Sequence, residues 1–167
     1  MYNNRGNTPL QHAARNGLFD VARKLVLERN AEVNSRNRHG STPLLLASEY
    51  GHTDVVQLLL ENNADVDVHD ADGDTPLHCA ALGGQIEVAQ ILLGLNVAVN
   101  SKNNMGFTPL HQAARGWYDG SAGFVRLLLD YGADVRVRSL DGETASEVAR
   151  GPEQQEIIRL LSQHAAE

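Results

Sequence analysis

The sequence has little cysteine, few aromatic residues and no long apolar run. One cysteine, Cys79, in 167 residues excludes an internal disulfide and fits a reducing compartment. Aromatic residues make up 5% of the chain, so its apolar contacts must come mainly from Leu, Val and Ala. No apolar run is long enough to cross a bilayer, and the first residues do not resemble a secretory signal. These absences favour an intracellular protein, cytoplasmic or nuclear, without membrane contact.

Basic residues are missing from one quarter of the chain. Residues 41–80 hold eight acidic side chains and no Lys or Arg, whereas residues 1–40 hold seven basic and three acidic ones. The net charge is −7. Nucleic-acid binding needs a continuous basic face, so we expect no nucleic-acid partner. The uneven charge suits attraction of a protein with complementary charge, and it equally suits a solvated surface that keeps the chain soluble.

Patterns for catalysis and metal binding are also absent from the sequence. It has no motif of a Ser-His-Asp hydrolase, no glycine-rich phosphate-binding loop and no zinc-peptidase helix motif. His69, with Asp70, Asp72 and Asp74, comes nearest to a ligand set, and we interpret it as a polar turn. We therefore expect no enzyme activity, no catalytic residue, no metal and no cofactor.

A repeated segment dominates what the sequence does contain. Thr-Pro-Leu begins at Thr8, Thr42, Thr75 and Thr108, and a degenerate copy, in which Ala145 replaces the proline, begins at Thr144. The steps between these threonines are 34, 33, 33 and 36 residues. A period in this range predicts a solenoid, in which each unit buries its apolar face against the next one.

The third copy shows what each unit forms. Thr75 is suited to cap a helix, and Pro76 to be its first residue, where the missing N–H is not needed. Leu77, Ala80 and Ala81 follow at the spacing of one helix face, and the two alanines let neighbouring helices approach closely. Cys79 lies among them, so we expect it to be buried.

A second, more apolar helix follows in each copy. Glycines end the first helix and turn the chain before it. The patterns predict helices over 19–29, 42–49, 53–61, 85–93 and 153–164.

Two segments match a known signature closely: Thr75-Pro76-Leu77-His78 and Thr108-Pro109-Leu110-His111. With the period and the paired helices, they resemble the ankyrin repeat. The resemblance implies an all-α solenoid of helix-turn-helix units joined by β-turn or hairpin loops. It also implies that the two histidines form a structural hydrogen bond between turns. One domain over 1–167 would hold repeats at about 5–37, 38–70, 71–103, 104–139 and 140–164.

Three irregularities interrupt this pattern. One extra residue lies near Arg23-Lys24, and we expect a helix bulge or a longer exit loop to absorb it. Trp117-Tyr118-Asp119 is inserted between the helices of the fourth repeat. No polar cap precedes the first repeat, so we expect the natural protein to continue N-terminally.

The last helix has the pattern of a C-terminal cap, with one apolar and one polar side. We expect Ile157, Ile158, Leu160 and Leu161 to face inward, and Glu153, Gln154, Glu156, Arg159 and Gln163 to face outward.

The resemblance also implies a binding surface at the variable positions of ankyrin-type binders. These are the two residues before the repeat glycine, the one after it, and the end of the first helix. Here they are Arg38, His39, Ser41, Glu49, Tyr50, Ala71, Asp72, Asp74, Leu82, Asn104, Met105, Phe107, Arg115, Leu140 and Asp141, joined by Trp117 and Tyr118 of the insertion. Glu143 extends the row, and Asn7, Arg15 and Asn16 open it.

The apolar members of this set are the most informative. Met105, Phe107, Trp117 and Tyr118 belong to one repeat, and we expect them to face outward. Aromatic residues and Met are favoured at interface centres. The alternative is that Trp117 folds back onto a neighbouring helix.

The pattern as a whole predicts a monomeric protein-interaction module that binds a partner protein through its concave face. Two alternatives stay open: a regulatory ankyrin segment of a larger multidomain protein, and an ankyrin-type inhibitor of an enzyme such as a kinase. Asn34 and Asn100 occupy positions where ankyrin domains are asparagine-hydroxylated, which would make the chain a substrate.

The role of Trp117 is testable by substitution. If it anchors a partner, Trp117→Ala lowers the partner affinity by roughly 2 kcal/mol or more, because truncating a buried aromatic anchor removes its contacts. Titration calorimetry measures this loss. Unchanged affinity together with a lower melting temperature would instead identify Trp117 as a packing residue.

Overall fold

The computed structural model describes residues 6–116, 120–151 and 154–165. These residues form ten helices and no strand. The helices are α1 (Pro9–Arg15), α2 (Phe19–Arg29), α3 (Pro43–Tyr50), α4 (Thr53–Glu61), α5 (Pro76–Gly83), α6 (Ile86–Gly94), α7 (Pro109–Ala114), α8 (Ser121–Asp130), α9 (Ala145–Val148) and α10 (Gln155–His164).

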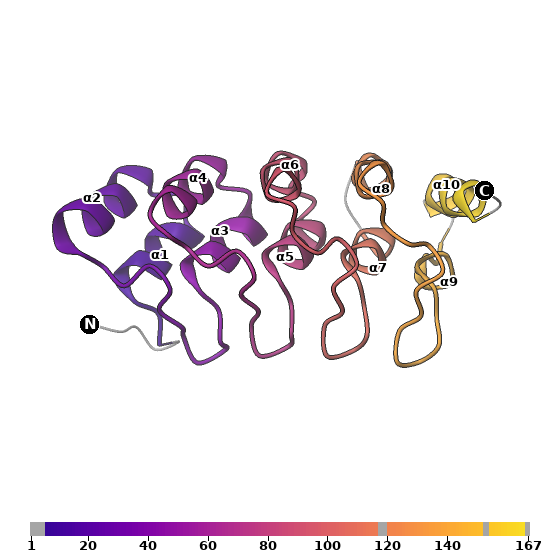
Figure 1. Cartoon of the computed structure of the whole chain (residues 1–167), viewed down its shortest axis with the longest axis horizontal. Helices are drawn as coiled ribbons and strands as arrows, with labels where there is room; N and C mark the ends of the chain where they lie inside the picture. The colour runs from indigo at the N-terminus through magenta and orange to yellow at the C-terminus, as the bar shows by residue number, and fades with distance from the viewer. Residues whose placement is uncertain (1–5, 117–119, 152–153, 166–167) are drawn as a thin grey trace.

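The helices form two layers that run the length of the molecule (Figure 1). Odd-numbered helices make the inner layer, even-numbered helices make the outer layer, and long loops extend from the inner side in a row. The two chain ends lie at opposite ends of the row. The predicted all-α solenoid is confirmed, because each helix pair packs on the pair before it.

The inner helices begin as the sequence predicts. The hydroxyls of Thr8, Thr42, Thr75 and Thr144 accept a hydrogen bond from a backbone N–H in the first turn. Proline follows the capping threonine in α1, α3, α5 and α7. Ala145 replaces that proline in α9, which has only four residues. This last inner helix is therefore the least preorganised of the set.

The extra residue of the first repeat is taken up by the helix itself. Helix α2 has 11 residues without a break, whereas α4 and α6 have nine each. Each of these helices is followed by an asparagine in the left-handed conformation. Asn30 follows α2 directly, whereas one residue separates Asn63 from α4 and Asn96 from α6. The structure thus shows neither the bulge nor the longer exit loop that we expected.

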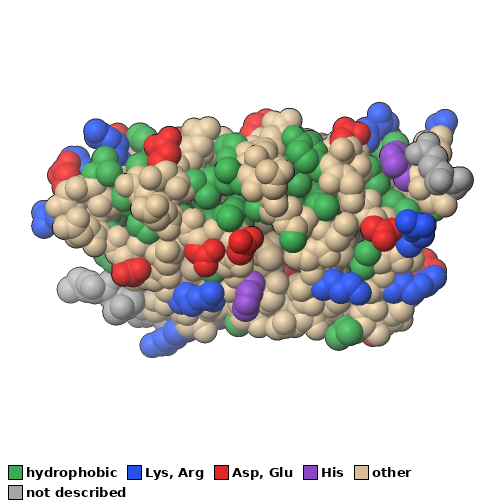
Figure 2. Space-filling view, viewed as in Figure 1, with side chains coloured by type: hydrophobic (Ala, Val, Ile, Leu, Met, Phe, Trp, Pro, Cys, Tyr) green, Lys and Arg blue, Asp and Glu red, His purple; other side chains and the backbone are tan. Residues whose placement is uncertain are grey.

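Small and aliphatic side chains build one continuous core through all the helix pairs. Ala80 and Ala81 are fully buried, Leu77 is 2% exposed, and the same positions are buried in α1 and α7. Alanine at these positions lets the inner helices approach closely, so each pair seals the face of its neighbour. On one flank a band of apolar side chains stays visible below the outer helices (Figure 2).

Cys79 is buried, as predicted, but in a separate small cluster with Leu45 and Val68. Burial raises the pKa of its thiol well above the ordinary value, and the charges of Asp74, Asp70 and Glu49 add to the rise. The neutral thiol is therefore an inert packing group.

The two histidines of the repeated signature join successive units, as predicted. His78 Nδ1 lies 2.8 Å from Thr75 Oγ1 and 3.3 Å from the Thr75 amide nitrogen, which donates to it. His78 Nε2 lies 2.9 Å from the carbonyl oxygen of Phe107 in the next repeat. Because Nδ1 accepts the amide hydrogen, Nε2 carries the ring hydrogen and donates it. His111 repeats this arrangement with Thr108 and, at 3.1 Å, the Glu143 carbonyl.

The first two repeats have Gln11 and Leu45 in place of the histidine. Gln11 accepts from the Thr8 amide through Oε1 at 2.7 Å, and its Nε2 donates to the Ser35 and Ser41 carbonyls at 2.8 and 2.9 Å. Leu45 has no side-chain hydrogen bond to offer and packs on Cys79 instead. A glutamine can therefore replace the histidine without losing the link.

The final helix is amphipathic, with one exception to the predicted pattern. Ile157 and Leu161 are buried, Ile158 and Leu160 are half-buried, and Glu156, Arg159 and Gln163 are exposed.

Gln154 is the exception, and the prediction that it faces outward is wrong. Its side chain is buried because it lies just before α10, where its Nε2 donates to the Gly116 carbonyl at 3.3 Å. The helix begins at Gln155, and Glu153 lies outside the described residues. Across the described part of the chain, no helix has the length and apolarity needed to span a membrane.

Removing one buried leucine tests the stacking. Leu77→Ala leaves a cavity between repeats and should cost roughly 2–5 kcal/mol of unfolding free energy. Leu82→Ala is the matched control, because Leu82 lies on the same helix and is 53% exposed; it should change stability by less than about 0.5 kcal/mol. Urea unfolding measures both, and equal midpoints for the two variants would contradict the stacking.

Burial of the histidines predicts a pH dependence of stability. Burial lowers the pKa of His78 and of His111 below the ordinary 6.5, against the opposing effect of their carbonyl partners. The unfolded chain therefore binds more protons than the folded chain below about pH 6.5. The stability that the neutral rings contribute is complete above that pH and is lost as the pH falls through their folded pKa values.

Glutamine substitution isolates this effect. The His78→Gln/His111→Gln variant keeps the hydrogen-bonding pattern of Gln11 but does not titrate, so it should lose less stability than the unaltered protein between pH 7.5 and 5. Urea midpoints across this range measure the difference. Burial raises the pKa of Glu49 and of Asp70, and this makes the folded state more stable as the pH falls, opposite to the histidine effect. Both proteins keep these two residues, so their contribution cancels in the comparison. Parallel stability profiles would contradict the prediction.

Candidate protein-interaction surface

Four five-residue loops, which we call the loop row, form the edge of the molecule beside the inner helices. They comprise residues 37–41, 70–74, 103–107 and 139–143. In each loop the first amide donates to the fifth carbonyl, at 2.9–3.1 Å. Each loop is therefore a closed turn that holds its middle residues outward.

The first side chain of each loop closes the turn a second time. Asp70 Oδ1 accepts from the amides of Asp72 and Asp74 at 2.9 and 3.0 Å. Asn37 and Asn103 do the same in their loops. The acidic run after His69 is thus a self-bonded turn, in line with our interpretation. Among the described residues no group of three or more His, Cys, Asp or Glu could hold a metal ion.

Backbone hydrogen bonds connect successive loops. The amide of Ala71 donates to the His39 carbonyl at 3.0 Å, and the amide of Asn104 donates to the Asp72 carbonyl at 2.9 Å. Leu140 donates to Met105 in the same way at 3.0 Å. The loop row is therefore one bonded surface.

Glycine permits this close approach. Gly40, at φ +73°, faces the next loop so closely that a Cβ atom would lie 2.9 Å from the Ala71 nitrogen. At Gly73, with φ +80°, it would lie 2.8 Å from the Asn104 nitrogen. Both the backbone conformation and the lack of space require glycine.

Most of the expected binding positions reach solvent on this surface. The exposed ones are Arg38, His39, Tyr50, Ala71, Asp72, Leu82, Asn104, Met105, Arg115, Leu140 and Asp141, together with Asn16. Ser41, Glu49, Asp74, Arg15 and Glu143 are half-buried, and Asn7 is buried. Trp117 and Tyr118 lie outside the described residues. Leu140, at 78%, and Met105, at 51%, are exposed apolar side chains of the loop row.

Phe107 does not face outward, and that expectation is wrong. Its side chain is only 4% exposed. Its ring stacks on His111 with the centroids 5.4 Å apart and the planes 11° apart. The position follows the glycine at the base of the loop, where the Phe107 carbonyl accepts from His78, so the ring lies against the inner helices. Partner contact by Phe107 remains untested.

The inner helix ends add ordered side chains to this surface. Arg15 lies with its guanidinium carbon 5.1 Å from the centre of the Tyr50 ring, and its Nη2 donates to the Tyr50 hydroxyl at 2.9 Å. This contact links the ends of α1 and α3. A cation–aromatic pair of this kind fixes two long side chains before any partner arrives.

Negative charge is concentrated over the second and third repeats. Burial raises the pKa of Glu49, although Arg15 acts in the other direction. Burial also raises the pKa of Asp70, and the charges of Asp74 and Asp72 add to the rise. Residues 41–80 contain no Lys or Arg, so the cations near these carboxylates come from the first 40 residues, as Arg15 does beside Glu49. A cationic group of a partner is therefore favoured over this part of the surface.

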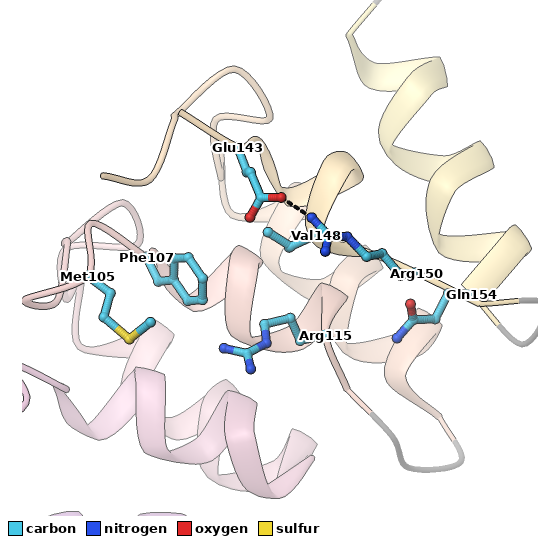
Figure 3. A pocket seen from close by; sticks show the side chains of 7 residues that line it. All are labelled: Met105, Phe107, Arg115, Glu143, Val148, Arg150 and Gln154. Atoms are coloured by element: carbon cyan, nitrogen blue, oxygen red, sulfur yellow. Dashed lines mark hydrogen bonds and ion pairs between the residues drawn. The ribbon is translucent and has the colours of Figure 1, made fainter. Parts of the chain in front are cut away.

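A hollow of about 330 Å³ lies between the fourth and fifth repeats (Figure 3). Its lining comprises Met105, Phe107, Arg115, Glu143, Val148, Arg150 and Gln154. Sequence reasoning missed Val148, Arg150 and Gln154, because the fifth repeat is degenerate and its helix is short. The Gly151-Pro152 break was the only available signal that the chain returns here.

Asn34 and Asn100 each connect two repeats through their side chains. Asn34 accepts from the Asp65 amide at 2.9 Å and donates to the Asn63 carbonyl at 3.1 Å. Asn100 forms the equivalent bonds with Asp134 and Gly132. Hydroxylation at these two residues remains a prediction.

Comparisons with known proteins agree with this architecture. A family model described as ankyrin repeats (3 copies) matches residues 1–70 and 44–139. Ankyrin repeats are generally non-catalytic and mediate protein interactions.

Several curated proteins resemble short parts of the chain. A transient receptor potential cation channel subfamily A member 1 homolog of Caenorhabditis elegans is 47% identical over 53 residues. The E3 ubiquitin-protein ligase XBAT33 of Arabidopsis thaliana is 49% identical over 51 residues. Alpha-latrocrustotoxin-Lt1a of Latrodectus tredecimguttatus is 42% identical over 53 residues.

These matches cover 30%, 30% and 32% of the chain, and 4%, 10% and 4% of the three relatives. The chain therefore shares with them a repeated unit within much longer proteins. The family match over most of the sequence, the stacked helix pairs and the histidine links between repeats lead to one conclusion: the chain belongs to the ankyrin repeat family.

Proposed function

We propose that the chain is a protein-binding module that grips its partner along the loop row and the ends of the inner helices. Residues 1–167 act as one domain of five repeats, at about 5–37, 38–70, 71–103, 104–139 and 140–164. The module performs no reaction of its own and acts as a monomer.

One observation carries this proposal: exposed side chains stand on a hydrogen-bonded surface that needs no further ordering. Tyr50, Leu82, Met105 and Leu140 are all exposed apolar residues of this side. Two-point closure of each loop and the bonds between loops fix the backbone at Met105 and Leu140, while Tyr50 and Leu82 are fixed by their helices, α3 and α5. A preordered surface spends less of its contact energy on ordering when a partner binds.

A specific observation also favours a role as a regulatory segment of a larger protein. The curated relatives contain the matching repeats in 4–10% of their length. In that case the same surface binds a partner or another part of its own chain.

A pair of tyrosines tests which surface binds. Tyr50→Ala on the inner side should weaken binding of proteins captured from a cell lysate at least about tenfold, about 1.4 kcal/mol, because it removes an ordered aromatic contact. Tyr131→Ala is the matched control, because Tyr131 caps the outer helix α8 and is exposed to a similar degree, 48% against 40%. Quantitative mass spectrometry of the captured proteins measures the loss, and circular dichroism checks that both variants are folded.

Either of two results would refute the proposal. One is a set of captured proteins that Tyr50→Ala leaves unchanged. The other is an equal loss with Tyr131→Ala, which would move binding to the outer helices.

A further inference from the structure

We propose that the hollow between the fourth and fifth repeats is a specificity pocket that receives one Asp or Glu side chain of the bound protein, with Arg115 as its cation. This inference rests on the proposed function and names the chemistry that the partner must carry at one position.

Three parts of the chain supply most of the pocket wall, and Gln154, just before α10, completes it (Figure 3). Met105 and Phe107 come from the third loop of the loop row, and Arg115 follows α7. Glu143, Val148 and Arg150 come from the fifth repeat, around α9. The volume of about 330 Å³ is enough for one side chain of a partner and its first backbone atoms.

Arg115 is held in place by an aromatic ring and has no ion-pair partner among the described residues. Its guanidinium carbon lies 5.3 Å from the centre of the Phe107 ring. That ring is buried and stacked on His111, which is itself hydrogen-bonded at both nitrogens. The stack therefore holds the guanidinium against a fixed ring. Arg115 forms no salt bridge with any residue that the structure describes.

The other cation of the pocket is already paired. Arg150 forms a salt bridge with Glu143, so the two side chains add polarity but no net charge. Among the described residues that line the pocket, only Arg115 is a cation without a salt bridge. Its planar guanidinium can donate two parallel hydrogen bonds to a carboxylate, which is the strongest arrangement available to it.

Apolar groups complete the site. Met105, which is exposed, and the edges of the buried Phe107 and Val148 side chains line the pocket, where they can contact the methylene carbons of an Asp or Glu side chain. They also leave less room for water around the ion pair than a flat surface would, and less water strengthens the attraction.

Charge elsewhere on the surface directs a carboxylate to this pocket. The second and third repeats present Glu49, Asp70, Asp72 and Asp74 with no Lys or Arg between residues 41 and 80. A negative side chain of the partner is repelled there and attracted at Arg115. The pocket thus also sets which way the partner lies along the row.

A display library of random 12-residue peptides tests the proposal. Peptides selected on the unaltered protein should carry Asp or Glu at one fixed position, and selection on Arg115→Gln should lose that preference. Arg126→Gln is the matched control: Arg126 lies on the outer helix α8 and pairs with Glu156, so the change in charge is the same but outside the pocket. It should leave the preference intact.

One selected peptide then gives the decisive comparison. Replacing its conserved acid by the amide should weaken binding to the unaltered protein at least tenfold and to Arg115→Gln by less than twofold. If Arg115→Gln melts at a lower temperature than the unaltered protein, Arg115→Lys serves instead; it keeps the charge, loses the planar fork and should retain only part of the preference.

The possible failures are distinguishable. Selected peptides without a fixed acid, or an acid preference that survives in Arg115→Gln, would overturn the pocket and leave the proposed function standing. A conserved phosphoserine preference, tested with phosphorylated copies of the peptides, would overturn the carboxylate assignment. No selected peptide at all would count against the binding module and its pocket together.

Discussion

The contact between the alanine-lined faces of successive helix pairs is the interaction on which the rest of the structure depends. No pair has enough apolar surface to be stable alone, and each becomes stable only by covering its neighbour. Ala80 and Ala81 are fully buried because the next inner helix lies directly against them. This close spacing also brings the loops near enough for backbone hydrogen bonds, so the loop row is a consequence of the packing.

The link from packing to recognition is made by polar groups at the base of each loop. Both ring nitrogens of His78 and of His111 form structural hydrogen bonds, so neither is available for catalysis. Asp70 Oδ1 likewise accepts two hydrogen bonds from amides of its own turn. The middle residues of the loops, such as Asp72, Met105 and Leu140, are exposed and differ from one repeat to the next. An interaction surface with a fixed backbone and variable side chains is the physical result.

The sequence predicted the fold well because its signals were local and repeated. Thr75, Pro76 and the glycines fix where helices start and end, and the period fixes how they stack. The outward position of Phe107 was wrong because a one-repeat pattern cannot show that His111 and Arg115 both lie against its ring. Gln154 was misplaced for a similar reason, since its partner, Gly116, is 38 residues away in the chain. The pocket could not be predicted, because it needs the relative positions of two repeats, one of them degenerate.

Hydrogen–deuterium exchange of the module with and without a captured partner tests the central claim most directly. The account predicts slower exchange on binding at the loop amides of residues 38–41, 71–74 and 104–107 and at the ends of α3 and α5. It predicts little change in the outer helices α2, α4, α6 and α8. Protection confined to those outer helices, with the loop row unchanged, would contradict it.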